Sequence, residues 1–144
     1  MKITDEAKVS RVLDSISSGS TTCYGYGLSM LDETNQNSFS ELDFFVEFGD
    51  YTAASLFLQG SDDNSTWYNL TGSEVDLVSG YGYSLGVINI INPQDAYLRL
   101  GITRDTATVD GAIAIQHSPK HCPVVQDESV EADHSVVSPS HGTI

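Results

Sequence analysis

The chain has 144 residues, with 20 Asp and Glu against 6 Lys and Arg and a formal net charge of −14. A domain of this length can bury a hydrophobic core without help from metal ions or disulfides. Because a strongly negative field repels phosphate groups, the composition argues against a nucleic-acid partner.

The chain contains no apolar run of membrane-spanning length, and residues 1–6 lack the apolar core of a secretory signal. We therefore expect no membrane partner and synthesis in a cytoplasm. Cys23 and Cys122 have neither metal-ligand nor redox-motif spacing. In a reducing compartment we expect two free, partly buried thiols.

Residues 1–20 are predicted to form an N-terminal arm that leads into an edge strand. The next stretch, 21–31, is rich in β-forming residues but is interrupted by Gly25 and Gly27. Glycine inside a strand often marks a bulge or a close approach of another backbone. We therefore expect an interrupted strand here, followed by a polar loop at 32–38.

The clearest pattern lies in the middle of the chain. Apolar side chains occupy every second position from Leu42 to Phe48 and again from Ala54 to Leu58, with a glycine-containing break between them. A period of two places these side chains on one face of a strand. We predict an antiparallel hairpin with one buried face. Phe45 and Phe57 fall out of phase with the buried set, so both are candidate contacts with a neighbouring strand or a partner.

Further segments carry strand patterns after the polar turn at 61–66. They are residues 67–70, 75–78, 85–91, 96–103 and 109–116. The run from Leu85 to Ile91 is almost continuously apolar, which predicts a strand covered on both faces. In the last segment, apolar side chains alternate from Val109 to Ile115. Short strands separated by frequent turns predict an all-β, antiparallel β-sandwich of immunoglobulin-like or jelly-roll type over residues 21–118.

The composition changes after residue 118. Residues 124–144 contain acids and scattered valines but no Lys or Arg, so this segment cannot form a core of its own. We predict an extended acidic C-terminal arm over 119–144 that orders on a neighbouring subunit. Val124 and Val125 are its candidate contacts.

Two clusters carry side chains of the metal-ligand type. Asp62, Asp63 and Asn64 place oxygen atoms in one loop, but their spacing lacks the bidentate Glu of a helix-loop-helix calcium site. We interpret them as a hairpin turn and as no more than a weak metal candidate. His117 and His121 lie in a proline-containing segment, which argues against a helix that would align both on a zinc ion. We interpret them as structural or interface histidines.

No motif supports catalysis. The chain has neither a Gly-x-Ser-x-Gly elbow nor a glycine-rich phosphate loop that opens a helix. We therefore expect no enzyme and no cofactor. Trp67, Tyr68, Tyr81 and Tyr83 could form a platform for sugars, because flat rings suit pyranose faces; aromatic core or turn residues are the competing interpretation.

Three segments together resemble a group of small β-rich virion proteins of tailed bacteriophages. They are the pair of patterns at 42–58 with its Ser-Asp-Asp turn and Trp67, the strand Ala96-Tyr97-Leu98-Arg99-Leu100, and the closing segment His117-Ser118-Pro119-Lys120-His121-Cys122-Pro123. The resemblance spans residues 40–123 and implies a structural component of the virion head that decorates or cements the capsid lattice. The resemblance implies no catalytic residues in this chain.

The residues and this resemblance together imply a non-enzymatic protein, made in the host cytoplasm, that is expected to bind the capsid exterior as a homo-oligomer. The resemblance makes the major capsid protein its partner, and the acidic charge agrees with a place away from packaged DNA. A tail or head–tail connector component of the same virion is one alternative. A carbohydrate-binding module that uses the aromatic set is the other.

Overall fold

The computed structural model describes residues 6–33, 36–49, 53–77, 85–126 and 130. These residues form twelve β-strands. In chain order the strands are β1 (Lys8–Leu13), β2 (Ile16–Gly19), β3 (Cys23–Tyr24), β4 (Leu28–Ser29), β5 (Leu31–Asp32), β6 (Asn37–Phe48), β7 (Ala53–Ser61), β8 (Tyr68–Asn69), β9 (Val75–Leu77), β10 (Leu85–Ile91), β11 (Tyr97–Asp105) and β12 (Ala107–Pro119). The short β3, β4 and β5 occupy the stretch that the sequence predicts to be interrupted.

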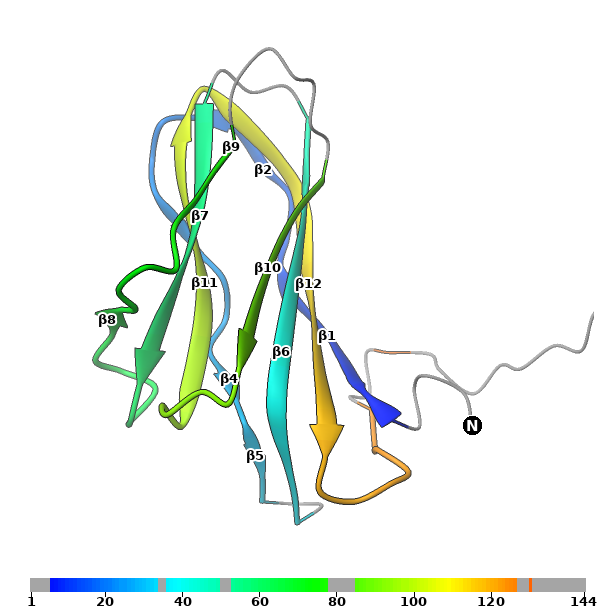
Figure 1. Cartoon of the computed structure of the whole chain (residues 1–144). Coiled ribbons are helices and arrows are strands. Elements are labelled where there is room, and N and C mark those ends of the chain that lie inside the picture. Colours follow the sequence, from blue (N-terminus) through cyan, green and yellow to red (C-terminus); the bar gives the residue numbers. More distant parts are fainter. Residues whose placement is uncertain (1–5, 34–35, 50–52, 78–84, 127–129, 131–144) are drawn as a thin grey trace, which may run out of the picture.

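The strands build two antiparallel sheets (Figure 1). Sheet A has the order β1-β12-β6-β10, with β2 also paired to β12 and β5 to β6. Sheet B has the order β3-β11-β7-β8, with β4 also paired to β11 and β9 to β7. Buried side chains from both sheets make one hydrophobic cluster. The predicted antiparallel β-sandwich is therefore confirmed.

The strands pair in a nested order along the chain. In sheet A, β1 pairs with β12 and β6 with β10; in sheet B, β3 pairs with β11 and β7 with β8. Early strands thus meet late strands, as in a long antiparallel hairpin that has been rolled into two layers. This nesting is the jelly-roll topology, so the structure decides between the two sandwich types that the sequence leaves open.

The predicted hairpin between residues 42–48 and 54–58 is wrong. β6 belongs to sheet A and β7 to sheet B, so these strands lie on opposite sides of the core and share no ladder. Each still buries alternate side chains, as Phe44 and Leu56 illustrate at 0% exposure. One-sided burial gives the same sequence pattern whether the next strand pairs alongside or crosses to the other sheet.

The prediction that residues 85–91 are covered on both faces is also wrong. This segment is β10, the last strand of sheet A in the described part of the chain. Gly86 and Ile88 are buried, whereas Leu85, Val87 and Ile91 are 54%, 46% and 63% exposed. The second apolar face of β10 is thus the exposed, outer face of sheet A.

A β-bulge reverses the alternation in β12. The register against β6 shifts between Val109 and Gly111. Val109 is buried before the shift, but Ala112 and Ala114 take the buried positions after it. Ile113, which a continuous alternation from Val109 would bury, is 41% exposed. A bulge adds one residue to one strand, and a one-residue shift turns every later side chain to the other face.

A buried cation ties irregular segments to the sandwich. Arg104 of β11 is 8% exposed. Its Nε donates to the carbonyl of Thr21, and its Nη1 donates to the carbonyls of Ser17 and Ala107, each at 2.8 Å. One guanidinium thus holds β2, the segment between β2 and β3, and the start of β12.

Both ends of the described chain belong to the domain. β1 is the edge strand of sheet A. Residues 120–126, the first part of the predicted C-terminal arm, pack against their own sheet. The side-chain amide of Asn37 bonds both the carbonyl and the N–H of His121, and Gln126 accepts from the N–H of Val9 and donates to the carbonyl of Ala7. Residues 1–5 and most of 127–144 lie outside the described residues.

Candidate functional site

An apolar row crosses three neighbouring strands on the outer face of sheet A. Phe45 of β6 pairs with Val87 of β10 on one side and with Ile113 of β12 on the other. Paired residues in a sheet project to the same side, and these three reach the surface, with Phe45 half-buried. Leu85 and Ile91 extend the apolar surface along β10. Contiguous apolar surface of this kind marks an interaction site more often than single exposed side chains do.

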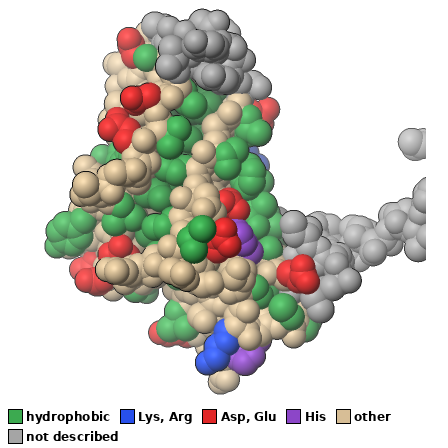
Figure 2. Space-filling model, in the orientation of Figure 1, with side chains coloured by type: hydrophobic (Ala, Val, Ile, Leu, Met, Phe, Trp, Pro, Cys, Tyr) green, Lys and Arg blue, Asp and Glu red, His purple; other side chains and the backbone are tan. Residues whose placement is uncertain are grey.

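A polar cluster borders the apolar row. His117 lies with Nε2 2.7 Å from Oδ2 of Asp43 and with Nδ1 3.3 Å from Oε2 of Glu41. The side-chain amide of Asn89 donates to both carboxylates. These side chains come from β12, β6 and β10 and hold one another in place. Figure 2 shows acidic and histidine side chains beside hydrophobic ones on the face in view.

Asp43 and His117 of this cluster also line a groove of about 560 Å³ that reaches Phe45, Pro119 and Cys122. Both ring nitrogens of His117 face carboxylate oxygens, so neither is placed to take a proton from the Cys122 thiol. The groove therefore offers apolar walls with an acidic edge, which suits contact with another molecule.

The structure brings together only part of the predicted contact set. Phe45 and His117 share the outer face of sheet A, whereas Phe57 lies on the outer face of sheet B. Val124 is 7% exposed in the core cluster and is not available to a partner, because the anchored segment 120–126 turns it inward. Val125 remains 54% exposed, and the side chain of His121 is exposed after β12.

Sequence reasoning missed Leu85, Val87, Ile91 and Ile113. One available signal was Asn89, the single polar side chain in the run 85–91, which shares its phase with the three exposed residues of β10. An amide on one face of an otherwise apolar strand indicates that this face is in contact with water. Nothing comparable in the sequence marks Ile113, because its exposure depends on the bulge.

Two of the four residues of the predicted sugar platform, Trp67 and Tyr68, lie among the described residues. Trp67 is half-buried, with the Arg99 guanidinium 4.4 Å from the centre of its ring, and Tyr68 is 62% exposed on β8. Tyr81 and Tyr83 lie outside the described residues.

The loop with Asp62, Asp63 and Asn64 is closed by its own hydrogen bonds. Oδ1 of Asp63 accepts from the N–H of Thr66 at 2.7 Å, the N–H of Ser65 at 2.9 Å and the hydroxyl of Ser61 at 3.0 Å. One carboxylate oxygen of Asp63 thus serves to close the loop itself. Among the residues that the structure describes, no group of three or more His, Cys, Asp or Glu side chains is arranged to hold a metal ion.

The hydrogen bonds from Thr66, then Ser65 and Ser61, hold the pKa of Asp63 below its ordinary value of 3.8. We expect Asp63→Asn to be less stable than the wild type at neutral pH, and the difference to shrink in acid. A lowered folded-state pKa stabilises the fold above pH 3.8, and this contribution is lost as the pH falls through the folded-state value. Urea midpoints measured at neutral pH and well below pH 3.8 test this. A difference that stays constant across that range contradicts it.

Cys23 is buried and Cys122 exposed, and both are free. The described part of the chain contains no helical span suited to crossing a lipid bilayer.

No protein-family model matches the sequence, and no curated protein matches it either. The fold does have solved counterparts. The crystal structure of the PBSX exported protein XepA aligns with 98% of this chain, with a TM-score of 0.54 and 13% sequence identity. The chain spans 45% of the length of XepA. At this identity the likeness concerns the fold alone.

Two further solved structures align less well. The Yersinia pseudotuberculosis-derived mitogen aligns over 81% of this chain and 97% of its own, with a TM-score of 0.43 and 11% identity. A chain from the cryo-EM structure of Broad Bean Stain Virus aligns over 83% and 94%, with a TM-score of 0.37 and 8% identity. Neither similarity is close enough to support a functional argument.

Proposed function

We propose that this protein is a non-enzymatic virion component that attaches to the outer surface of a capsid lattice through the outer face of sheet A. The observation that carries the proposal is the apolar row of Val87, Phe45 and Ile113, which crosses three strands and reaches the surface. Jelly rolls are common in capsid proteins, and a phage exported protein shares the fold. One fold can host many functions, so the proposal rests on the apolar surface of sheet A and not on the fold.

Charge supports an exterior position and a partner with basic side chains. A protein with a net charge of −14 is repelled by packaged DNA. Glu41, Asp43 and Glu47 form an acidic border around the apolar row, so the partner surface pairs an apolar centre with Lys or Arg side chains. The proposed partner is the major capsid protein, and a homo-oligomer of this chain would gain avidity from repeated lattice sites.

We expect Phe45→Ser to weaken attachment to capsids by about tenfold, which corresponds to losing about 1.4 kcal/mol of aromatic contact at the interface. The half-buried ring lies outside the core, so the variant still folds. Co-sedimentation with capsids assembled from the major capsid protein of the same genome measures the affinity.

Phe57→Ser is the matched control, because it makes the same change on the outer face of sheet B. Its attachment should equal that of the wild type. Undiminished attachment of Phe45→Ser, or no attachment of the wild type to capsids, contradicts the proposal.

Copy number separates this role from that of a tail or head–tail connector component. A lattice-bound protein occurs in purified virions at a copy number close to that of the major capsid protein. A tail or connector component is present in few copies, and that result would move the protein to the alternative.

A further inference from the structure

The outer face of sheet B carries a second surface of different construction. Tyr24 of β3, Gly101 of β11 and Phe57 of β7 form one row across the sheet. Any Cβ atom at position 101 would overlap the ring of Phe57, so the glycine allows this ring to lie over the neighbouring strand. Tyr24 meets the ring edge-on, with the two ring centres 6.2 Å apart.

The adjacent row holds polar groups in fixed positions. Arg99 Nε donates to Oε1 of Gln59, and Nε2 of Gln59 donates to Oδ1 of Asn69, each at 2.7 Å. The Arg99 guanidinium lies 4.2 Å from the ring centre of Tyr24 and 4.4 Å from that of Trp67. Because the oxygen of Asn69 is engaged by Gln59, the amide nitrogen of Asn69 is the group left to donate to a ligand.

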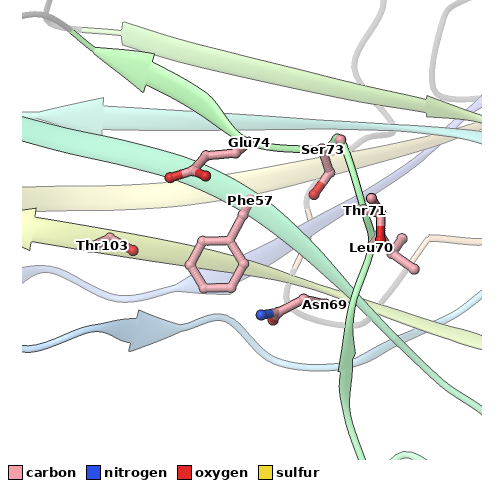
Figure 3. A pocket seen from close by; sticks show the side chains of 8 residues that line it. Phe57, Asn69, Leu70, Thr71, Ser73, Glu74 and Thr103 are labelled. Carbon is pink, nitrogen blue, oxygen red and sulfur yellow. The ribbon is translucent and has the colours of Figure 1, made fainter.

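A groove of about 310 Å³ opens beside Phe57 (Figure 3). Asn69, Glu74 and Thr103 surround the ring, and all three are exposed. The groove thus combines an aromatic ring with an amide donor, a carboxylate acceptor and a hydroxyl that does both. Small-molecule sites typically have apolar walls with a few placed polar groups and begin at about 300 Å³.

We propose that this groove binds a neutral saccharide. The C–H face of a sugar ring stacks on Phe57, and its hydroxyl groups bond to Asn69, Glu74 and Thr103. The net charge of −14 and the Glu74 carboxylate act against anionic glycans. This role goes beyond capsid attachment and does not depend on it, because it uses the sheet opposite the apolar row.

Calorimetric titration of the full chain with neutral oligosaccharides of glucose, galactose and N-acetylglucosamine tests the proposal. At least one series should bind with a Kd of about 1 mM or tighter. Phe57→Leu, which keeps an apolar side chain but removes the ring, should weaken binding by about tenfold or more. Glu74→Gln, an exposed and conservative change, should weaken it by a smaller factor.

Tyr26→Ala is the control, since this side chain is 65% exposed and is not part of the groove. It should bind like the wild type. The absence of binding by all three series up to about 10 mM overturns the proposal. Unchanged binding by both Glu74→Gln and a folded Phe57→Leu protein also overturns it. If the Phe57→Leu protein does not fold, unchanged binding by Glu74→Gln alone overturns the proposal.

Discussion

Replacing Phe44 by alanine should lower the free energy of unfolding by about 3–5 kcal/mol, the usual cost of removing a buried aromatic side chain. Phe44 is 0% exposed in β6, between Ile88 of β10 and Ala114 of β12. The small Ala114 cannot fill the space that the ring leaves between the two sheets, so a cavity remains. Urea denaturation followed by circular dichroism measures the loss.

Phe45→Ala is the matched control, because it makes the same change one residue further along the same strand. Its ring lies on the outer face and is half-buried, so we expect a loss of only about 1 kcal/mol. Equal losses for Phe44→Ala and Phe45→Ala would contradict the orientation of β6 on which the apolar row depends.

Arg104→Met should cost about 2–4 kcal/mol, because charge-assisted hydrogen bonds contribute about 1.5–3 kcal/mol and unmet buried acceptors add a penalty. The change leaves the carbonyls of Ser17, Thr21 and Ala107 without their donor. Methionine keeps much of the side-chain volume, so the loss reports mainly on the hydrogen bonds. The urea midpoint again measures it.

Arg11→Met controls for the removal of a positive charge. The ion pair of Arg11 with Asp14 is exposed, with side chains 63% and 74% accessible, and exposed pairs contribute about 0–1 kcal/mol. Its midpoint should stay close to that of the wild type. A drop as large as that of Arg104→Met would mean that net charge, and not the three carbonyl bonds, determines the loss.

The sequence predicts the strands better than their partners. Alternation in β6 and β7 correctly separates Phe44 and Leu56, which face the core, from Phe45 and Phe57, which face outward. It cannot tell which sheet each strand joins, because nested pairing brings together segments as distant as β1 and β12. Local patterns record burial, while sheet order depends on contacts between distant segments.

The candidate site is predictable only in part for the same reason. The outward phase of Phe45 can be read from β6 alone. Its neighbours Val87 and Ile113 become visible only once β10 and β12 are paired to β6 in the correct register. The contact of His117 with Glu41 and Asp43 likewise requires the pairing of β12 with β6. The bulge after Val109 reverses the apparent pattern and hides Ile113.

A cryo-EM map of the intact virion tests the central claim most directly. We expect this chain on the exterior of the shell, with Val87, Phe45 and Ile113 of sheet A against the capsid protein and the groove beside Phe57 open to solvent. A map in which these three side chains face solvent while another surface makes the contact would contradict the account. So would a map that places the chain inside the shell beside the genome.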